Sequence, residues 1–181
     1  MRTKDKRAIR ESYDFLGGRL YDARYEAEQR EKYDEILGLV TLLGDEVILD
    51  NGCGTGLLLE RLENPAVGVD LSCSLLSRAR SRFSARREVH LAQSDSDRLP
   101  FRPQVFDKVF AVTLIQNTPD PRRTMCEMKR VALAGSDIIV TALKKSFSIR
   151  DFRRLIDGSG LFLKTMIGKD ALKDWIALAK A

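Results

Sequence analysis

A glycine-rich turn after a short apolar run is the stretch of this chain best suited to chemistry. Gly52, Gly54 and Gly56 stand at alternate positions directly after the apolar residues 47–49. Such a run, bounded by glycines, is typical of a buried parallel strand. Glycine permits positive φ and leaves no Cβ between the backbone and a ligand, and the first turn of a helix offers unpaired N–H groups. The pattern predicts that a ligand approaches this backbone and that a helix begins at Leu57.

The spacing of the glycines separates two classes of nucleotide ligand. Dinucleotide-binding turns read G-x-G-x-x-G, and their third glycine lets helix and strand pack closely. Here Leu57 occupies that third position, and the last glycine comes one residue earlier, at Gly56. About twenty residues after the start of the turn, Asp70 ends a second apolar run (66–69), where either class places a carboxylate for the ribose hydroxyls. The pattern therefore predicts a ligand that carries a ribose.

With these residues the sequence resembles the class I S-adenosylmethionine-dependent methyltransferases. The resemblance covers the chain from about Tyr13 to the C-terminus and keeps the family's order of segments. The segments that carry it are LDNGCGTG (49–56), GVDLS (68–72), DSDRLPF (95–101) and FDKVFAVTLIQNTPDP (106–121). Asn51 departs from the family, which usually has an aliphatic residue there. Strand alternation directs its side chain away from the ligand.

The resemblance implies an α/β fold with a Rossmann-like, seven-stranded, mostly parallel sheet. Its last strand is antiparallel, helices cover both faces, and a helical cap precedes it. We expect a single methyltransferase domain over residues 1–181, with the cap at 1–44 and the Rossmann-like core at 45–181, a length that suits one domain. The further strands are expected at 89–92, 106–113, 137–142, 161–167 and 175–179, and the helices at 22–43, 75–87, 121–133 and 146–156.

The resemblance also implies how S-adenosylmethionine is held. The turn amides would bind its methionine end and Asp70 its sugar, while Asp95 would accept from the adenine amino group and the Ser96 amide would face the ring. The alternative interpretation of Asp95 and Ser96 is that they form an ordinary polar turn. Cys53 is expected to be a small residue of the turn, because no neighbour in sequence activates its thiol. The expected cofactor-binding residues are Tyr13, Asp50, Gly52, Cys53, Gly54, Gly56, Asp70, Leu71, Asp95, Ser96 and Thr113.

The first forty residues predict a polar helical cap. Apolar residues recur at helical spacing over 22–43, with Gly38 as a tolerated interruption, and the pair 17–18 predicts a mobile glycine turn. In similar methyltransferases such a segment folds over the cofactor and the acceptor. Tyr13 and Tyr21 either do this or are packing residues with solvated hydroxyls. The basic first ten residues predict a frayed, solvated tail.

The loop that follows the expected fourth strand should face the transferable methyl group, because ligands of open α/β sheets bind beyond the carboxyl ends of the strands. It lacks the Asn/Asp-Pro-Pro-aromatic signature of enzymes that methylate exocyclic nitrogens, which leaves a ring nitrogen, a carbon or an oxygen as acceptor. Asn117 either hydrogen-bonds the acceptor or caps the helix that begins near Asp120. In-line transfer depends mainly on alignment, so no catalytic residue is assigned; Asn117 and Tyr21 are the candidates.

The charge balance of the chain is compatible with a polyanionic partner. There are 31 Lys and Arg residues against 26 Asp and Glu, giving a net charge of +5. Lys144, Lys145 and Arg150 follow the fifth expected strand on the ligand-binding edge. The arginines of the helix at 75–87 predict a solvated outer face, which could also track phosphates.

The favoured function is methylation of an rRNA or tRNA base. LPFRPQVFD (99–107) resembles the corresponding stretch of eukaryotic enzymes that methylate rRNA at a guanine ring nitrogen. The alternative is a small-molecule methyltransferase resembling the quinone-biosynthesis enzymes. A non-catalytic scaffold is disfavoured by the intact glycines and acids of the cofactor pattern.

Partners and location follow from the same features. Several relatives of the RNA-modifying kind require a small zinc-binding activator that adds a strand at the sheet edge, which would place Val89 and Leu91 at the docking site. The cysteines Cys53, Cys73 and Cys126 form no CxxC pair, so neither a metal site nor a disulfide is expected. No apolar run suits a bilayer span or a signal peptide, which predicts a cytoplasmic protein without membrane association.

Overall fold

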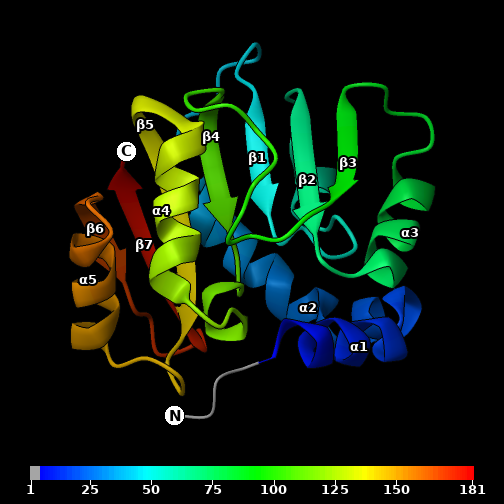
Figure 1. Ribbon diagram of the computed structural model, residues 1–181, viewed down its shortest axis with the longest axis horizontal. Helices are drawn as coiled ribbons and strands as arrows, with labels where there is room; N and C mark the ends of the chain where they lie inside the picture. Colours follow the sequence, from blue (N-terminus) through cyan, green and yellow to red (C-terminus); the bar gives the residue numbers. More distant parts are fainter. Residues whose placement is uncertain (1–4) are drawn as a thin grey trace.

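A seven-stranded sheet forms the centre of the computed structural model, which describes residues 5–181 (Figure 1). The strand order is β3-β2-β1-β4-β5-β7-β6, and β7 runs antiparallel to both of its neighbours while the other pairs are parallel. The expected fold is therefore confirmed. The strands are β1 (Ile48–Asn51), β2 (Ala66–Asp70), β3 (Val89–Gln93), β4 (Phe106–Ala111), β5 (Ala132–Leu143), β6 (Phe162–Ile167) and β7 (Asp174–Lys180).

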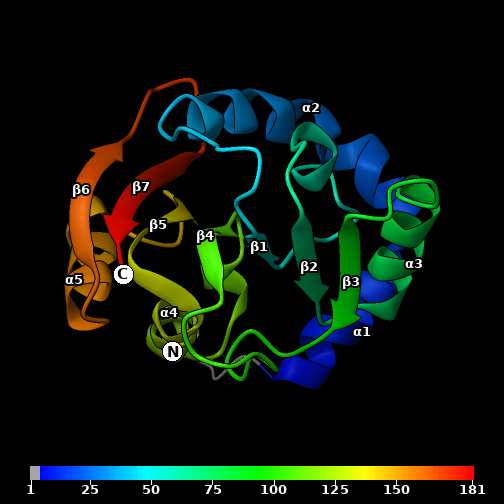
Figure 2. The same cartoon turned by 90° about the horizontal axis from the view of Figure 1, so that it is seen from above.

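Helices cover both faces of the sheet, and a further helix lies beneath its lower edge. One apolar layer joins the sheet to α2 and α3, and a second joins it to α4 and α5 (Figure 2). The first helix, α1, lies near the carboxyl ends of β1 to β3 (Figure 1). The helices are α1 (Lys6–Leu16), α2 (Gly18–Leu37), α3 (Cys73–Arg82), α4 (Pro121–Val131) and α5 (Ile149–Gly158), with short 3-10 turns η1 (Leu59–Arg61) and η2 (Ile115–Asn117).

Strand β1 shows why its apolar run forms the middle of the sheet. Ile48 and Leu49 are both fully buried, the first in the layer of α2 and α3 and the second in the layer of α4 and α5. Successive side chains of a strand point to opposite faces, so a strand covered on both sides needs apolar residues at every position. Parallel pairing with β2 and β4 then brings the loops after these strands to one edge.

The helix expected to begin at Leu57 does not form. The segment after Gly56 consists of turns and the short η1, and Leu57, Leu58 and Leu59 are all buried, with exposures of 7%, 1% and 0%. Three consecutive buried positions do not suit a helix that rests one face on a sheet. Pro65 also comes too soon for a longer helix, since its carbonyl already accepts from the Ile48 amide as β2 begins.

Two other helix boundaries also differ from expectation. Helix α2 begins four residues earlier than expected, and Gly38 ends it as its C-cap, donating its N–H to the Asp34 carbonyl. Gly38 is thus a terminator rather than an interruption. Helix α5 begins after Ser148, whose side chain accepts from the Asp151 amide, so the helix starts three residues later than expected.

The boundary between α4 and β5 also differs from expectation. Helix α4 ends at Val131, and β5 follows at once from Ala132, although the expected helix ran on to residue 133. The pairing of β5 with β4 is irregular between Phe106 and Lys108, and Gly135 has a φ of 75°. Because of this irregular start, the first residues of β5 do not show the alternation of apolar and polar side chains that predicts a strand.

Asp5 caps α1 by accepting a hydrogen bond from the Arg7 amide. Residues 6–10 belong to this helix, so the expected fraying is wrong there, although Arg7, Ala8 and Arg10 are exposed to solvent. Residues 1–4 lie outside the described residues. Gly17 joins α1 to α2 with a φ of 69°. A Cβ at the buried Gly18 would overlap the side chain of Arg78, so the joint is tightly packed.

Candidate functional site

A cavity lies at the carboxyl ends of the strands, between α1 and the loops that follow β1 to β4. Its unfilled space is about 710 Å³ including the open mouth. Most of the expected cofactor-binding residues line it: Tyr13, Gly52, Gly54, Asp70, Leu71, Asp95, Ser96 and Thr113. Asp50, Cys53 and Gly56 do not, because they are buried behind the turn. We call this space the first cavity.

The glycine turn provides open backbone rather than free donors. Gly52, Gly54 and Gly56 have φ values of 84°, 55° and 82°, which side chains rarely adopt. A Cβ at Gly52 would overlap Leu114, and one at Gly56 would overlap Phe83. The amides of residues 52, 53, 54 and 56 each donate within the protein. The turn therefore offers a ligand a surface without side chains, not a row of unpaired N–H groups.

Two acidic side chains lie at the inner end of the first cavity, of which only Asp70 belongs to its lining. Asp70 accepts from the Gly54 amide at 2.9 Å and from the Ser72 amide at 2.8 Å. Burial raises the pKa of Asp70, although these backbone hydrogen bonds oppose the rise. Asp50 is buried behind it, and burial together with the charge of Asp70 raises the pKa of Asp50 to about 8. A cation bound in the first cavity would favour the ionised form of both groups.

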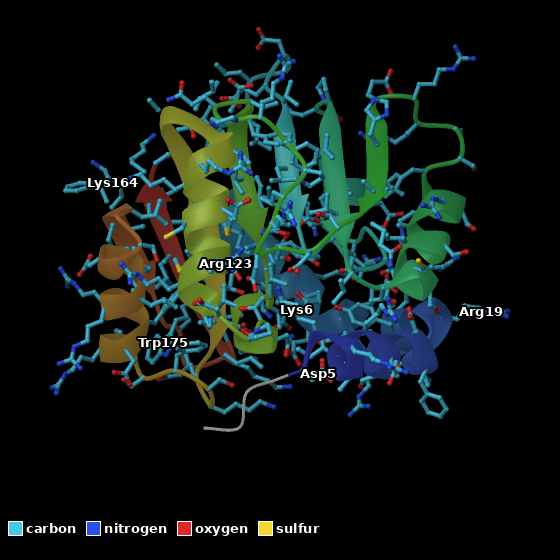
Figure 3. All side chains as sticks on the ribbon, in the orientation of Figure 1. Asp5, Lys6, Arg19, Arg123, Lys164 and Trp175 are labelled. Carbon is cyan, nitrogen blue, oxygen red and sulfur yellow. The ribbon has the colours of Figure 1, made fainter. Side chains whose placement is uncertain are left out.

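Lys6 connects the first helix to the opposite side of the first cavity. Its Nζ lies 2.6 Å from Asp95 Oδ2 and 2.7 Å from Asp97 Oδ2. Although partial burial opposes it, hydrogen bonds to these two carboxylates raise the pKa of Lys6. Figure 3 shows Lys6 near the lower end of the sheet, whereas Arg19, at the start of α2, extends outward on the right. Sequence reasoning missed this contact because one lysine in a basic stretch carries no signal of its partner.

Asn117 holds the boundary of the cavity rather than a helix end. Its Nδ2 donates to Tyr13 Oη at 3.0 Å and to the Thr113 carbonyl at 3.1 Å. Helix α4 is capped instead by Asp120, whose side chain accepts from the Arg123 amide. The capping interpretation of Asn117 is therefore wrong.

Neither tyrosine at this boundary is poised to act as a base. Burial raises the pKa of Tyr13 to about 12, and burial also raises the pKa of Tyr21. Both hydroxyls therefore remain protonated at neutral pH. Their rings lie 6.3 Å apart, and Tyr25 continues the row at 5.0 Å from Tyr21.

A second cavity adjoins the first one. Its unfilled space is about 1460 Å³ including its mouth. Four residues line both cavities and so form the boundary between them: Tyr13, Tyr21, Thr113 and Asn117. The second cavity is otherwise lined by Arg24, Tyr25, Glu28, Gln29, Gln116, Leu143, Lys144, Lys145 and Lys173. A group passed between two ligands would cross at this boundary.

A buried ion pair fixes Thr113 at the boundary. Lys32 of α2 is 1% exposed and Asp174 of β7 is fully buried, and Lys32 Nζ lies 2.6 Å from Asp174 Oδ2. The same Nζ donates to Thr113 Oγ1 at 2.7 Å, while the Thr113 amide donates to Thr141 Oγ1 at 2.8 Å. Thr113 has a φ of 56°, which is unusual for a β-branched residue, so these contacts stabilise a strained backbone.

The arginines of α3 have a structural role that the sequence did not predict. Arg78 Nε and Arg82 Nη2 lie 3.0 Å and 2.9 Å from Asp22 Oδ2 on α2. Arg82 also reaches Glu60 at 2.5 Å and is only 12% exposed in its side chain. These two arginines therefore tie the cap to α3. Arg82 is withdrawn from the expected solvated face, whereas Arg78, Arg80 and Arg87 remain exposed.

The cysteines take no part in the site as nucleophiles. Burial, followed by the charge of Asp50, raises the pKa of the Cys53 thiol well above its usual value. Cys73 and Cys126 are exposed and belong to neither cavity lining. In residues 5–181, no group of three or more His, Cys, Asp or Glu side chains could hold a metal ion. Nor does that part of the chain contain a helix long and apolar enough to span a bilayer.

The residues of the first cavity fit S-adenosylmethionine. Its methionine end carries a net positive charge, which would favour the ionised forms of Asp70 in the lining and of Asp50 behind it. Each Asp70 oxygen accepts one backbone hydrogen bond and retains a lone pair for a ribose hydroxyl. A Cβ at Gly54 would extend toward the Tyr21 ring, at 3.7 Å, so only glycine leaves this space open.

Known proteins support the same assignment. Residues 49–140 match the family model of the methyltransferase domain. A malonyl-[acyl-carrier protein] O-methyltransferase from Marinomonas is 32% identical over 146 residues, which cover 77% of this chain and 53% of that protein. A ubiquinone biosynthesis O-methyltransferase from Coxiella burnetii is 30% identical over 112 residues, covering 60% of this chain and 47% of that protein. The chain spans about half the length of the curated relatives it matches.

Solved structures share the fold over nearly the whole chain. One belongs to a complex between the Trm112 methyltransferase activator of Haloferax volcanii and a candidate methyltransferase; it has a TM-score of 0.81 at 16% identity and covers 93% of this chain and 97% of that one. A SAM-dependent methyltransferase of Thermotoga maritima has a TM-score of 0.75 at 17% identity, with the same coverage of both chains. Together with the family match, the cavity and its acids lead to one conclusion: the chain belongs to the class I S-adenosylmethionine-dependent methyltransferases.

Proposed function

We propose that this chain transfers the methyl group of S-adenosylmethionine to a small-molecule acceptor held in the second cavity. The observation that carries the proposal is the shared boundary, where four residues line both the first and the second cavity. The relatives matched in sequence are named for acceptors such as malonyl-[acyl-carrier protein], phosphatidylethanolamine and ubiquinone precursors, which supports a small or carrier-borne acceptor.

The expected cofactor-binding residues enter this proposal in the positions that the structure gives them. Asp70 binds the ribose hydroxyls, and Asp95 accepts a hydrogen bond from the adenine amino group. Asp50, buried behind Asp70, compensates the positive charge of the methionine end. Gly52 and Gly54 keep side chains out of the cofactor's path, while Gly56 allows the turn to pack against Phe83. The remaining members of the set, which surround these groups, are Tyr13, Cys53, Leu71, Ser96 and Thr113.

Methyl transfer requires mainly that the protein align the acceptor atom with the methyl group and the sulfur. Bound S-adenosylmethionine supplies a methyl group on a sulfonium, which is already electrophilic and transfers by in-line displacement. Asn117 keeps Tyr13 and the Thr113 carbonyl in place through two hydrogen bonds, and so fixes the width of the boundary. The row of Tyr13, Tyr21 and Tyr25 presents aromatic surface there. Since neither Tyr13 nor Tyr21 is poised as a base, the acceptor must present a lone pair or lose its proton before the transfer.

Radiolabelled cofactor tests the proposal directly. The protein is incubated with it and with separated RNA and metabolite fractions of the source cells. Label in a metabolite fraction is the expected result, and the variant Asp70→Asn should lose most of it. Label confined to RNA would contradict the small-molecule assignment, and no label in any fraction would contradict methyl transfer itself.

RNA methylation with an activator is the second candidate, and the free edge of β3 favours it. Strand β3 ends the sheet and pairs only with β2 among the described residues. Val89 is 9% exposed and Leu91 half-buried in the chain's own core, so the backbone edge, more than these two side chains, would receive an added strand. In the Haloferax volcanii complex, a protein of the same fold is bound to a methyltransferase activator, Trm112.

Coexpression with the small zinc-binding activator of the same organism tests this second candidate. Co-elution of the two proteins as one complex supports docking, and separate elution contradicts it. A cytoplasmic location also stays a prediction, which cell fractionation would check.

A further inference from the structure

We propose that the second cavity receives an acceptor bearing a carboxylate or phosphate group, an inference that rests on the proposed function and specifies its substrate class. Four basic side chains and one acidic side chain line this cavity: Arg24, Lys144, Lys145, Lys173 and Glu28. Such an excess of positive charge in one cavity favours an anion.

The charges that remain uncompensated are on two walls. Glu28 is already paired with Lys173, at 2.6 Å, so these two side chains cancel each other. Within residues 5–181, Arg24, Lys144 and Lys145 have no carboxylate oxygen within 4.0 Å. Arg24 belongs to α2, and the two lysines belong to the loop after β5. An anion between these walls therefore meets positive charge from both sides.

Lys144 is held in position while its charge remains available. Its Nζ donates to the Lys169 carbonyl at 2.7 Å and lies 5.0 Å from the centre of the Trp175 ring. Neither contact neutralises the ammonium group, and each limits the conformations that the side chain can adopt. Lys145 next to it is exposed. The pair thus combines one fixed cation with one adaptable cation.

Gln116 in the lining of the second cavity has a polar atom without a partner in residues 5–181. Gln116 is 5% exposed, and its Nε2 donates to the Thr113 carbonyl at 2.5 Å. That bond fixes the orientation of the amide, because a reversed amide would set its oxygen against the carbonyl. Gln116 Oε1 is buried without a hydrogen-bond partner among the described residues. A ligand hydroxyl or amine, or a water that accompanies it, would satisfy this oxygen.

The anion belongs to a small acceptor rather than to a nucleic acid backbone. The cations line the same cavity as Thr113 and Asn117, so one compact molecule can reach both the cations and the boundary. A nucleic acid strand would need a longer basic track over the surface. Two of the three arginines of α3 do not supply it freely, since Arg78 and Arg82 are paired with Asp22.

Matched probes test the charge requirement on protein loaded with S-adenosylhomocysteine. Calorimetry would compare 4-hydroxybenzoate with its neutral isostere 4-hydroxybenzamide, and phenyl phosphate with neutral phenol, which separates the carboxylate source from the phosphate source. At least one anionic probe should bind roughly tenfold tighter than its neutral partner, consistent with one charge-assisted interaction. Equal affinities within both pairs, or no binding of either anion, would overturn the proposal.

Variants then locate the site of binding. In the double variant Lys144→Ala, Lys145→Ala the preference for the anionic probe should fall at least fivefold, roughly the loss of 1 kcal/mol. The single variant Lys145→Ala changes an exposed position and should also lower the preference for the anionic probe, while the contacts of Lys144 stay intact. Lys164→Ala is the control, because Lys164 extends outward from β6 (Figure 3). Unchanged anion binding in the double variant, or an equal loss in the control, would contradict the assignment.

The labelled-cofactor experiment separates this inference from the proposed function. Metabolites are divided by anion exchange before the reaction, and methylated product is expected from the retained, anionic fraction. Label from the neutral fraction would overturn the anion requirement and leave small-molecule methyl transfer intact. Label in RNA would overturn both, in favour of the second candidate.

Discussion

Lys6 Nζ lies 2.6 Å from Asp95 Oδ2, so the first helix contacts the carboxylate that the family resemblance assigns to the adenine amino group. The same ammonium group reaches Asp97 at 2.7 Å. Helix α1 is also held by Asp14, whose carboxylate accepts from the Ser72 hydroxyl and the Ser74 amide. The cap is therefore attached on both sides of the first cavity and controls access to it.

Replacement of Lys6 should remove the contacts of α1 with Asp95 and Asp97. We predict that Lys6→Ala weakens binding of S-adenosylhomocysteine roughly two- to fivefold, mainly through faster dissociation, because partly exposed ion pairs contribute up to about 1 kcal/mol. Stopped-flow dissociation rates would measure this. Arg7→Ala is the matched control, since Arg7 is exposed and pairs within α1 with Glu11. Tighter binding in Lys6→Ala would show that Lys6 competes with the cofactor instead.

The pair of Lys32 and Asp174 should contribute to stability and to methyl transfer in separable ways. Lys32→Met leaves Asp174 charged and fully buried, so we expect a loss of about 3–5 kcal/mol in the free energy of unfolding. The double variant Lys32→Met, Asp174→Leu should regain much of that stability, because no unpaired charge remains.

Methyl transfer in that double variant should remain low even where stability returns. Thr113 would still lack the hydrogen bond that Lys32 Nζ donates at 2.7 Å. Urea titration and single-turnover rates are the two measurements. Full recovery of the rate together with the stability would show that Lys32 has only a structural role.

Asn51 is a polar residue in the core without a matching partner. It is 0% exposed, and neither Nδ2 nor Oδ1 has a hydrogen-bond partner within the described part of the chain. We predict that Asn51→Leu, which keeps the size and shape, raises the free energy of unfolding by about 1–3 kcal/mol by removing this unpaired group. Urea denaturation would measure the change. A destabilised variant would mean that Asn51 is satisfied by a water or a ligand.

The buried carboxyl of Asp50 predicts a pH dependence of the ligand-free protein. Its pKa of about 8 exceeds the unfolded value of 3.8, so the folded state retains a proton that the unfolded state has lost. The stability that this proton provides is complete below about pH 4 and is lost as the pH rises to about 8.

Comparison with Asp50→Asn isolates this contribution. Relative to wild type, the variant should gain up to about 1.4 kcal/mol of stability for each pH unit between about pH 4 and pH 8, and the difference should then level off. Denaturation at several pH values measures it. A difference that does not change with pH would show that Asp50 titrates normally in the folded protein.

The parts of the fold that sequence could predict are those that depend on local composition. The apolar run that forms β1, the glycines after it and Asp70 at the end of β2 each carry their own signal. The parts it could not predict depend on distant partners. Nothing near Lys32 in sequence indicates that Asp174 will neutralise it inside the protein. Arg78 likewise looks like a surface residue until α2 brings Asp22 to it.

The helix wrongly expected after Gly56 has the same kind of cause. Local propensity favours a helix over Leu57 to Leu59, but burial of all three side chains between α2, α3 and the sheet decides otherwise. The second cavity was not foreseen either, since Arg24, Gln116 and Lys145 come from three separate segments. Among its lining residues, only the basic pair Lys144 and Lys145 after β5 is visible in the sequence as a possible binding feature.

The most direct test of the account is calorimetric titration of the folded protein with S-adenosylhomocysteine and with NADH. Wild type should bind S-adenosylhomocysteine and give no heat with NADH. Asp70→Asn should bind more than tenfold more weakly, since hydrogen bonds to a charged group are worth about 1.5–3 kcal/mol, while the exposed Asp151→Asn should bind as wild type. Binding of NADH without any heat from S-adenosylhomocysteine would contradict the account.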